Sequence, residues 1–237
     1  MNSRVIIEQR LARYSENELI FASRFYREHC ADSMSEAAYY KSLQRMCEAE
    51  ALTKIAKGVY CKPLKTRFGT VLPSEKEIIK AFTQNSTGMV VGYTLYNSMQ
   101  LTTQVSKNIH VYSSCLEEQK KQVGSVSLQN YQMNFEEDVV RTIQMLEVLQ
   151  NYYKIQDLNQ VQFLRMCEQY ALNYNNEACE YVFAKIKYLK RTIAFLQKIL
   201  EYHNVPNNLN RYLSELSEYR IPSMEALYET ARVRTRI

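Results

Sequence analysis

Residues that interrupt regular structure, and residues that most often bind metals, are scarce in this chain. Only 5 glycines, 4 prolines and 3 histidines occur among its 237 residues. Hydrophobic residues make up 46% and charged residues 23%, which is the balance of a folded, helix-rich protein rather than a disordered one. The composition therefore predicts a mainly α fold with small β elements, an α+β class.

Long apolar runs are missing as well. No stretch approaches the roughly 18 consecutive apolar residues that a membrane span requires. Arg4, Glu8 and Arg10 interrupt the region where a signal peptide would have its apolar core. The six cysteines form no C-x-x-C pair and most have apolar neighbours, which favours buried, reduced thiols. We expect a cytoplasmic protein with no membrane contact.

Sequence motifs of catalysis and metal binding are also absent. His29, His110 and His203 occur in no H-x-x-x-H, H-x-E or H-x-H spacing that could seat a metal. The nucleophile elbow G-x-S-x-G, the GxxxxGK[ST] phosphate loop and the G-x-G-x-x-G turn do not occur either. We therefore predict no catalytic residue, no metal site, no cofactor and no enzymatic activity.

The net charge of +5 is concentrated in the N-terminal half. Residues 1–130 contain 17 Lys and Arg against 12 Asp and Glu, whereas residues 131–237 contain 13 of each. Residues 39–67 alone contain seven basic and two acidic side chains. A local excess of this kind is typical of a surface that binds a polyanion.

The N-terminal pattern predicts a winged helix-turn-helix over residues 1–67. The expected elements are a helix over 3–14, an apolar strand-like run over 19–22, a helix over 24–30 capped by Ser23, a helix from the Ser33-x-x-Glu36 capping box to about Glu50, and two β-prone runs over 52–56 and 59–62 joined by Lys57-Gly58. This order of helices followed by a two-stranded wing is that of a winged helix-turn-helix.

The remainder of the chain predicts two further domains. Residues 64–73 look like a linker, and residues 74–130 a small α+β unit that begins at a Ser74–Glu77 capping box. We expect that unit to contain an antiparallel pair over 108–112 and 122–128, and residues 131–237 to form a helical C-terminal domain. Its predicted helices span 135–153 (capped by Asn134), 158–174, 176–202 and 209–216.

In a helix-turn-helix the third helix enters the major groove, and its exposed side chains read the bases while the wing contacts the DNA backbone. Phosphate contacts position the protein, and base contacts specify the sequence. The predicted DNA-binding residues are Ser35, Tyr39, Lys41, Ser42 and Arg45 on the helix, and Lys54, Lys57 and Lys62 on the wing.

A different class of function stays open beside DNA binding. The basic segment is also compatible with an ordinary solvated surface, in which case the winged helix would be a scaffold. The tyrosine-rich helical domain would then bind a protein partner, because tyrosine suits both half-buried positions and interfaces. Arg232, Arg234 and Arg236 at the tail fit contact with DNA or an acidic partner, or a frayed end.

Four short segments resemble a known family: Lys57-Gly58-Val59-Tyr60, Pro73-Ser74-Glu75, Leu95-Tyr96-Asn97 and Leu101-Thr102-Thr103-Gln104-Val105. Over about residues 3–130 the chain resembles the AbiE-like (type IV) antitoxins, which are winged-helix transcriptional regulators of bacterial abortive-infection toxin–antitoxin loci. The resemblance implies a repressor that binds double-stranded DNA at its own operator. It also implies neutralisation of a nucleotidyltransferase-like toxin. A second copy of the chain is a further candidate partner.

Overall fold

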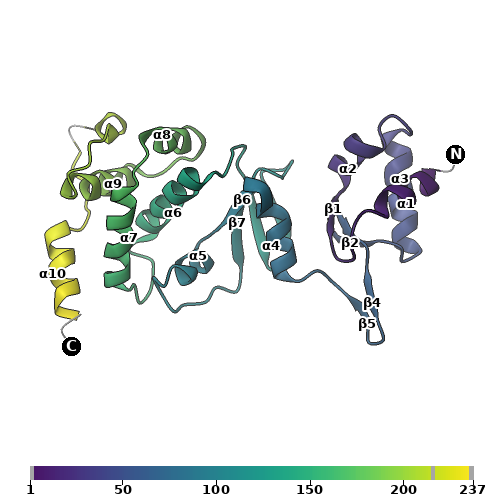
Figure 1. Cartoon of the computed structure of the whole chain (residues 1–237), viewed down its shortest axis with the longest axis horizontal. Helices are drawn as coiled ribbons and strands as arrows, with labels where there is room; N and C mark the ends of the chain where they lie inside the picture. Colours follow the sequence, from purple (N-terminus) through teal and green to yellow (C-terminus); the bar gives the residue numbers. More distant parts are fainter. Residues whose placement is uncertain (1–2, 215–216, 235–237) are drawn as a thin grey trace.

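The computed structural model describes residues 3–214 and 217–234. It is a mixed α and β chain whose parts follow one another along the long axis of the molecule, with the two termini at opposite ends (Figure 1). Within the described ranges, no helix has both the length and the apolar character needed to cross a membrane.

The N-terminal unit combines three helices with a small antiparallel sheet of strand order β1-β3-β2. Because successive strand residues face opposite sides, Ile20 packs under the helices while Leu19 and Phe21 face the middle of the molecule. The elements are α1 (Ser3–Leu11), β1 (Leu19–Phe21), α2 (Ala22–His29), α3 (Glu36–Glu48), β2 (Thr53–Ala56) and β3 (Val59–Cys61).

Two helix starts differ from the predicted ones. The second helix begins at Ala22 directly after Phe21, so Ser23 lies inside the helix and is not its cap. The third helix begins at Glu36, and its cap is Ser35, whose Oγ accepts a hydrogen bond from the Ala38 amide at 3.4 Å. A serine two residues earlier matched the capping-box pattern, but the backbone turns into the helix only after Ser35.

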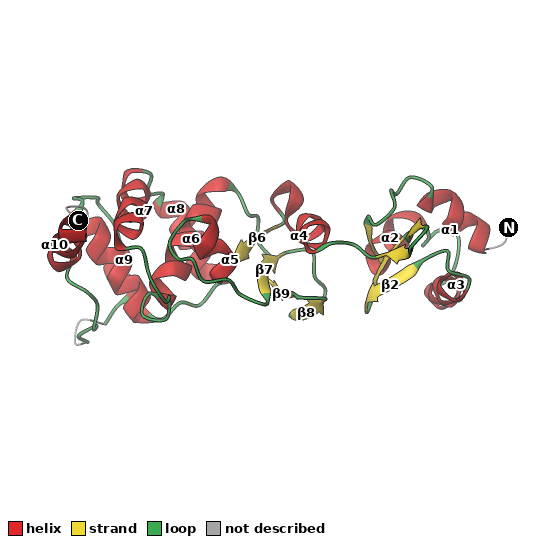
Figure 2. Ribbon diagram, turned by 90° about the horizontal axis from the view of Figure 1, so that it is seen from below, coloured by secondary structure: helices red, strands yellow, loops and turns green. Residues whose placement is uncertain are grey.

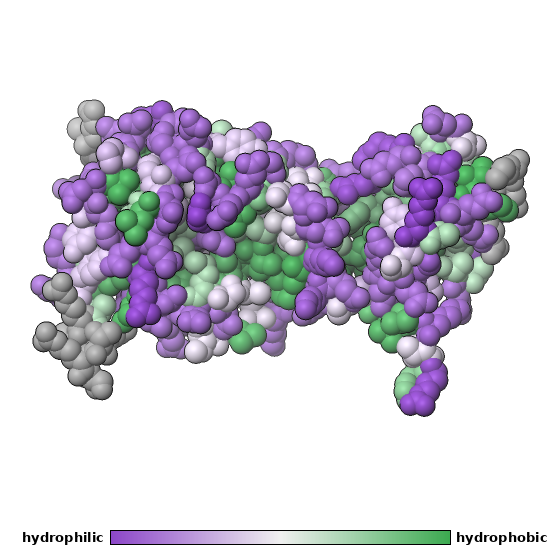
Figure 3. All heavy atoms as spheres, in the orientation of Figure 1, coloured by the Kyte–Doolittle hydropathy of each residue, from purple (hydrophilic) through white to green (hydrophobic). Residues whose placement is uncertain are grey.

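The segment predicted to be a linker is an ordered β-hairpin. Strands β4 (Leu64–Thr66) and β5 (Gly69–Val71) pair antiparallel and are largely exposed. The hairpin projects from the body of the molecule (Figures 1 and 3). The linker prediction is therefore wrong, since this segment has regular structure of its own.

The middle of the molecule is built on a four-stranded sheet of strand order β6-β7-β9-β8. The predicted Ser74–Glu77 capping box is confirmed at the start of α4. The elements are α4 (Glu75–Thr83), the short 3-10 helix η1 (Gln84–Ser86), β6 (Gly88–Val91), α5 (Tyr93–Ser98), β7 (Ile109–Ser113), β8 (Lys120–Val123) and β9 (Val126–Asn130).

The expected antiparallel pair within this sheet is wrong in its pairing. Strands β8 and β9 form a hairpin at Gly124, whose φ is +58°, and β9 then lies parallel to β7. The strand β6, which the sequence pattern did not predict, pairs antiparallel with the other side of β7. A parallel pairing of this kind is set by the chain's path between the strands rather than by the alternation of side chains within them.

Helices form the C-terminal part, as predicted, but with different limits. The cap of α6 is Glu136, not Asn134, and the expected helix over 176–202 is broken at Ile186–Leu189, where the chain is extended before a new helix starts. The predicted helix over 209–216 is a 3-10 turn, and residues 215–216 lie outside the described residues. The elements are α6 (Glu137–Asn151), α7 (Gln160–Leu172), α8 (Asn176–Lys185), α9 (Lys190–Tyr202), η2 (Leu209–Tyr212) and α10 (Met224–Arg234).

The buried apolar residues form three cores, of which the second and third join parts of the molecule. The first lies inside the N-terminal unit, and the second joins the outer face of its sheet to α4 and to one face of the four-stranded sheet. In that second core the rings of Phe21 and Phe82 meet edge to face at 5.0 Å. The third core extends from β6 and α5 through α6–α10. Figure 2 shows the four-stranded sheet between the N-terminal unit and the helical part.

The tyrosines of the helical part divide between core and surface. Tyr170 is buried, and Tyr188 is half-buried against the third core. Tyr153 and Tyr202 are 62% and 40% exposed. The core interpretation is therefore confirmed for Tyr170, and the interface interpretation of the exposed tyrosines stays a prediction.

Candidate nucleic-acid interface

The third helix, α3, has one buried side and one exposed side. Tyr39, Leu43 and Met46 are at most 2% exposed and pack into the first core. Ser42 is 8% exposed, and its Oγ donates to the Ala38 carbonyl at 2.9 Å. The expectation that Tyr39 and Ser42 belong to the exposed front of the helix is therefore wrong.

A hydrogen bond and contacts with two aromatic rings fix Tyr39 in the first core. Its hydroxyl donates to the carbonyl of Ala22 at 3.0 Å. Its ring is stacked on Phe25 at 6.2 Å and lies 5.2 Å from the ring of Tyr26. Burial raises the pKa of the Tyr39 phenol well above its usual value. A side chain fixed in this way has no route to a base edge.

The exposed side of α3 carries Gln44, Lys41 and Arg45. At about 100° per residue, these three side chains cover an arc of roughly 100° around the helix axis. Among the ion pairs of the described residues, none involves Lys41 or Arg45. Glu36 and Glu48 are also exposed on this helix, so the face is mixed, with both cations available to a ligand.

Lys54 and Lys57 lie on the hairpin formed by β2 and β3. Gly58 has a φ of +70°, the left-handed conformation that closes the turn expected at Lys57-Gly58. Lys54 is opposite Tyr60 in the ladder, and Tyr60 belongs to the core under the helices. Residues opposite each other share a face of the sheet, so Lys54 lies on the face that carries α3.

Both lysines also line a cleft of about 1110 Å³ between the N-terminal unit and the four-stranded sheet. Across this cleft Arg27 Nη1 lies 2.9 Å from Glu117 Oε1. Lys121 is the main cause of a lowered Glu118 pKa, and the charge of Lys57 contributes to it. Lys57 is thus close to an acid without forming an ion pair among the described residues.

The predicted basic residues consequently form two neighbouring groups rather than one patch. Lys41 and Arg45 project from the outer side of α3, whereas Lys54 and Lys57 lie toward the cleft. Gln44 lies between the two groups on the helix surface, because it follows Tyr40, a cleft-lining residue, by one helical turn.

Lys62 has a different environment from the other predicted contacts. Its Nζ donates to the carbonyl of Tyr14 at 2.6 Å, and the side chain is half-buried. Its own carbonyl accepts a hydrogen bond from the Asn17 amide at 2.9 Å. The ammonium of Lys62 is engaged within the N-terminal unit, so its assignment to the DNA-facing surface does not fit this geometry.

The β4–β5 hairpin adds cations that the sequence reading left out of the site. At its tip the Arg67 guanidinium lies 4.6 Å from the centre of the Phe68 ring, and Phe68 is 86% exposed. Lys65 forms an exposed ion pair with Glu50 at 3.1 Å. Residues 51–74 contain five basic side chains and no acidic one. The alternating, β-prone residues on either side of Gly69 were the signal that could have indicated a hairpin.

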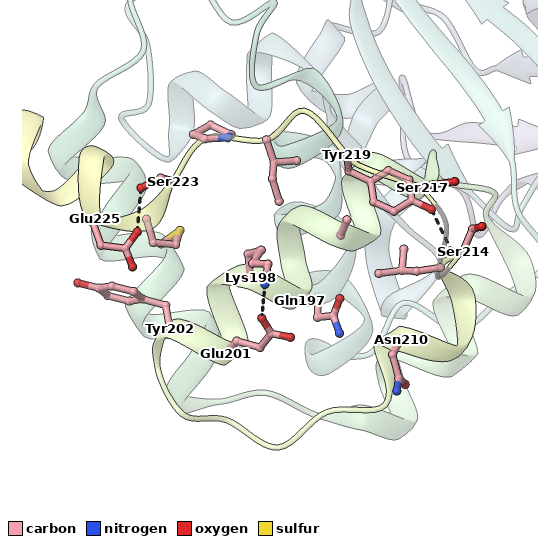
Figure 4. Close-up of a pocket in the computed structure, with 15 residues that line it drawn as sticks. Gln197, Lys198, Glu201, Tyr202, Asn210, Ser214, Ser217, Tyr219, Ser223 and Glu225 are labelled. Atoms are coloured by element: carbon pink, nitrogen blue, oxygen red, sulfur yellow. Dashed lines mark hydrogen bonds and ion pairs between the residues drawn. The ribbon is translucent and has the colours of Figure 1, made fainter.

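A second large cavity, of about 810 Å³, lies beside α9 in the C-terminal part (Figure 4). Two pairs of its polar side chains interact: Lys198 with Glu201 at 2.7 Å, and Ser223 with Glu225 at 2.8 Å.

Metal-ligating side chains do not gather in the described part of the chain, where no three of His, Cys, Asp and Glu could hold one ion. Of the three tail arginines, Arg236 lies outside the described residues, and the side chains of Arg232 and Arg234 are not described. The candidate DNA-binding cations whose side chains the structure describes are therefore those of the N-terminal unit and the β4–β5 hairpin.

Comparison with known proteins yields a family but no functional name. None of the curated proteins matches the chain. A family model, described as a family of unknown function (DUF6088), matches residues 6–149. The match includes the N-terminal unit from residue 6 onward, the projecting hairpin, the four-stranded sheet and nearly all of α6. Because it spans more than half of the 237 residues, the chain belongs to the DUF6088 family.

Proposed function

We propose that this protein is a DNA-binding transcriptional regulator whose N-terminal unit is a winged helix-turn-helix. The element order α1-β1-α2-α3-β2-β3 supports this proposal, with α3 as the recognition helix and β2–β3 as the wing. The observation that carries it is the exposed side of α3, where Lys41 and Arg45 are free of ion pairs among the described residues while the apolar side is fully buried.

The proposed contacts follow from the positions of the side chains. Gln44 and Arg45 suit base edges, because an amide matches adenine and a guanidinium matches guanine. Lys41, Lys54 and Lys57 suit phosphates on either side of the groove. Ser35 lies exposed at the start of α3, where the helix amides favour an anion.

The hairpin extends this surface in the proposal. Arg67 and Phe68 form a cationic and apolar tip on a projecting arm, the combination that minor-groove binders use. The arm has no acidic residue that would repel phosphate. We infer that β4–β5 contacts the duplex beside the segment read by α3.

By its resemblance to AbiE-like antitoxins, we further propose that the regulator represses its own operon and counteracts a nucleotidyltransferase-like toxin encoded beside it. Co-expression with the product of the adjacent gene tests this part of the proposal. Relief of growth arrest is expected, and continued arrest at matched expression would leave only the repressor.

A second candidate is an interaction protein that uses the helical part to bind a protein partner. Leu172 is 85% exposed and Leu189 is 54% exposed, and we propose that a partner at this end of the molecule would cover them. The two candidates differ in where binding is lost: at the N-terminal cations for a regulator, and at these leucines for a scaffold.

The test of DNA binding uses the full chain and a duplex taken from upstream of its own gene. Lys57→Ala should weaken binding to specific and scrambled duplexes alike, whereas Arg45→Ala should also reduce discrimination at one base pair by about 1–3 kcal/mol. Lys190→Ala is the matched control, since Lys190 is exposed on the distant α9. Equal effects of Lys57→Ala and Lys190→Ala in fluorescence anisotropy would contradict the proposal.

A further inference from the structure

A cavity of about 310 Å³ lies between the four-stranded sheet and the helices α5 and α6. Ligand pockets in proteins begin at about 300 Å³, so this one suits only a small molecule. Its walls include the side chains of Tyr93, Tyr96 and Tyr112. Neither α3 nor the β2–β3 hairpin lines the cavity, so it is separate from the candidate nucleic-acid interface.

A buried carboxylate forms part of the wall. Glu147 of α6 is 7% exposed and lines the cavity. Within the described residues no ion pair joins it to a lysine, arginine or histidine. Burial raises the pKa of Glu147 above its usual value. A buried carboxylate that forms no ion pair is costly, and a cationic ligand bound to it would reduce that cost.

Only one oxygen of this carboxylate is used by the protein. Glu147 Oε1 accepts hydrogen bonds from the hydroxyls of Tyr112 at 2.9 Å and Tyr188 at 3.3 Å. No described residue donates to Oε2. Among the described side chains, the fully buried polar atoms that have no hydrogen-bond partner are Asn17 Oδ1 and Arg141 Nε. Glu147 Oε2 is not among them, and Glu147 lines the cavity.

Two amide side chains that line the cavity, those of Asn151 and Gln129, also have an oxygen that accepts no hydrogen bond from a described residue. Asn151 Nδ2 donates to the Glu147 carbonyl at 3.0 Å, and Gln129 Nε2 donates to the Tyr131 hydroxyl at 2.8 Å. No described residue donates to the side-chain oxygen of either amide. Glu147 Oε2 and these two oxygens are three hydrogen-bond acceptors on residues that line the cavity, and no described residue donates to them.

The acceptors and the aromatic walls fit an ammonium group. An ammonium has three donors, and tyrosine ring faces attract cations. A metal ion fits less well, because no three His, Cys, Asp or Glu side chains gather among the described residues. Lys154, exposed on the cavity's lining, disfavours a second positive charge on the ligand.

We propose that this cavity binds a small primary monoamine, whose ammonium donates to Glu147 Oε2 and to the amide oxygens of Asn151 and Gln129. The tyrosine rings surround the ammonium, and the uncharged or anionic end of the ligand points toward Lys154. The site assigns a small-molecule role to the sheet, which lies within the family match, and to α6, of which the match covers residues 137–149.

The test measures binding of butylamine and 4-aminobutanoate to the full chain by two-dimensional NMR, with butanol and 4-hydroxybutanoate as counterparts that carry a hydroxyl in place of the ammonium. At least one amine should bind saturably and shift the signals of residues around Glu147, while its alcohol counterpart does not. Glu147→Gln should weaken that binding at least tenfold. Glu177→Gln is the matched control, because Glu177 is an exposed carboxylate of α8.

A second variant covers the case in which Glu147→Gln fails to fold. Tyr93→Leu keeps apolar bulk at a half-buried position but removes one ring, and it should weaken amine binding by between about twofold and thirtyfold. The proposal is overturned if neither amine binds, if an amine and its alcohol counterpart bind equally, or if a folded Glu147→Gln binds the amine like the unaltered chain. Where Glu147→Gln does not fold, unchanged amine binding by Tyr93→Leu overturns the proposal.

Discussion

Tyr39 and Tyr40 are neighbours in the chain with different surroundings. The Tyr39 hydroxyl reaches a main-chain carbonyl inside the first core. The Tyr40 hydroxyl lies 3.2 Å from Ser23 Oγ in a half-buried position. In a helix, Tyr39, Leu43 and Met46 follow the spacing i, i+4, i+7, and a stripe begun at Tyr40 follows an equally good spacing. The pattern alone therefore could not choose between the two tyrosines.

The core position of Tyr39 leads to a prediction. Tyr39→Phe removes one buried hydrogen bond but leaves the ring, so it should lower the free energy of unfolding by about 1 kcal/mol. It should not change the preference of the protein for one DNA sequence over another. Urea unfolding and DNA anisotropy on the same preparation measure both effects. Loss of base discrimination at unchanged stability would show that Tyr39 reads DNA after all.

At the scale of elements, strong local signals predicted structure well, whereas the pairing of strands far apart in the sequence was not predicted. The capping box at Ser74 was predicted because its signal lies within a few residues. The parallel pairing of β7 with β9 depends on β8 folding back first, which no local pattern encodes. The β4–β5 hairpin was mistaken for a linker because its strands are only three residues long and exposed.

The start of α3 offers a direct test at this scale. Ser35→Ala should lower the free energy of unfolding by about 1 kcal/mol, because it removes the side-chain acceptor of the Ala38 amide. Ser33→Ala should have an effect within about 0.5 kcal/mol, since Ser33 is an exposed turn residue. Thermal unfolding of the two variants side by side measures the difference. The reverse order would place the cap at Ser33.

The projecting hairpin has its own prediction. Arg67→Ala should leave stability within about 0.5 kcal/mol, because the side chain is exposed. It should weaken DNA binding and reduce the salt dependence by about 0.9 in log–log slope, the effect of one lost phosphate contact. Arg191→Ala, an exposed arginine of α9, is the control. Unchanged affinity for Arg67→Ala would exclude the arm from the interface.

At the scale of the whole molecule, one sheet links the two functions that we propose. The four-stranded sheet contacts the N-terminal unit through the core that contains Phe21 and Phe82. Its strand β6 contributes to the helical core, and the cavity that contains Glu147 lies on that side. The family match ends at residue 149, near the end of α6. Helices α7–α10 lie beyond the match but belong to the same helical core. The sequence predicted the order of these parts but not their shared packing, which depends on residues far apart in the chain.

The most direct test of the central claim is a salt titration of the full chain on a duplex from upstream of its own gene. If Lys41, Lys54, Lys57 and Arg67 each neutralise one phosphate, log affinity should fall against log salt with a slope of about −3.6. The scrambled duplex should bind more weakly at every salt concentration. A slope shallower than about −1, with equal affinity for both duplexes, would contradict DNA recognition by this surface.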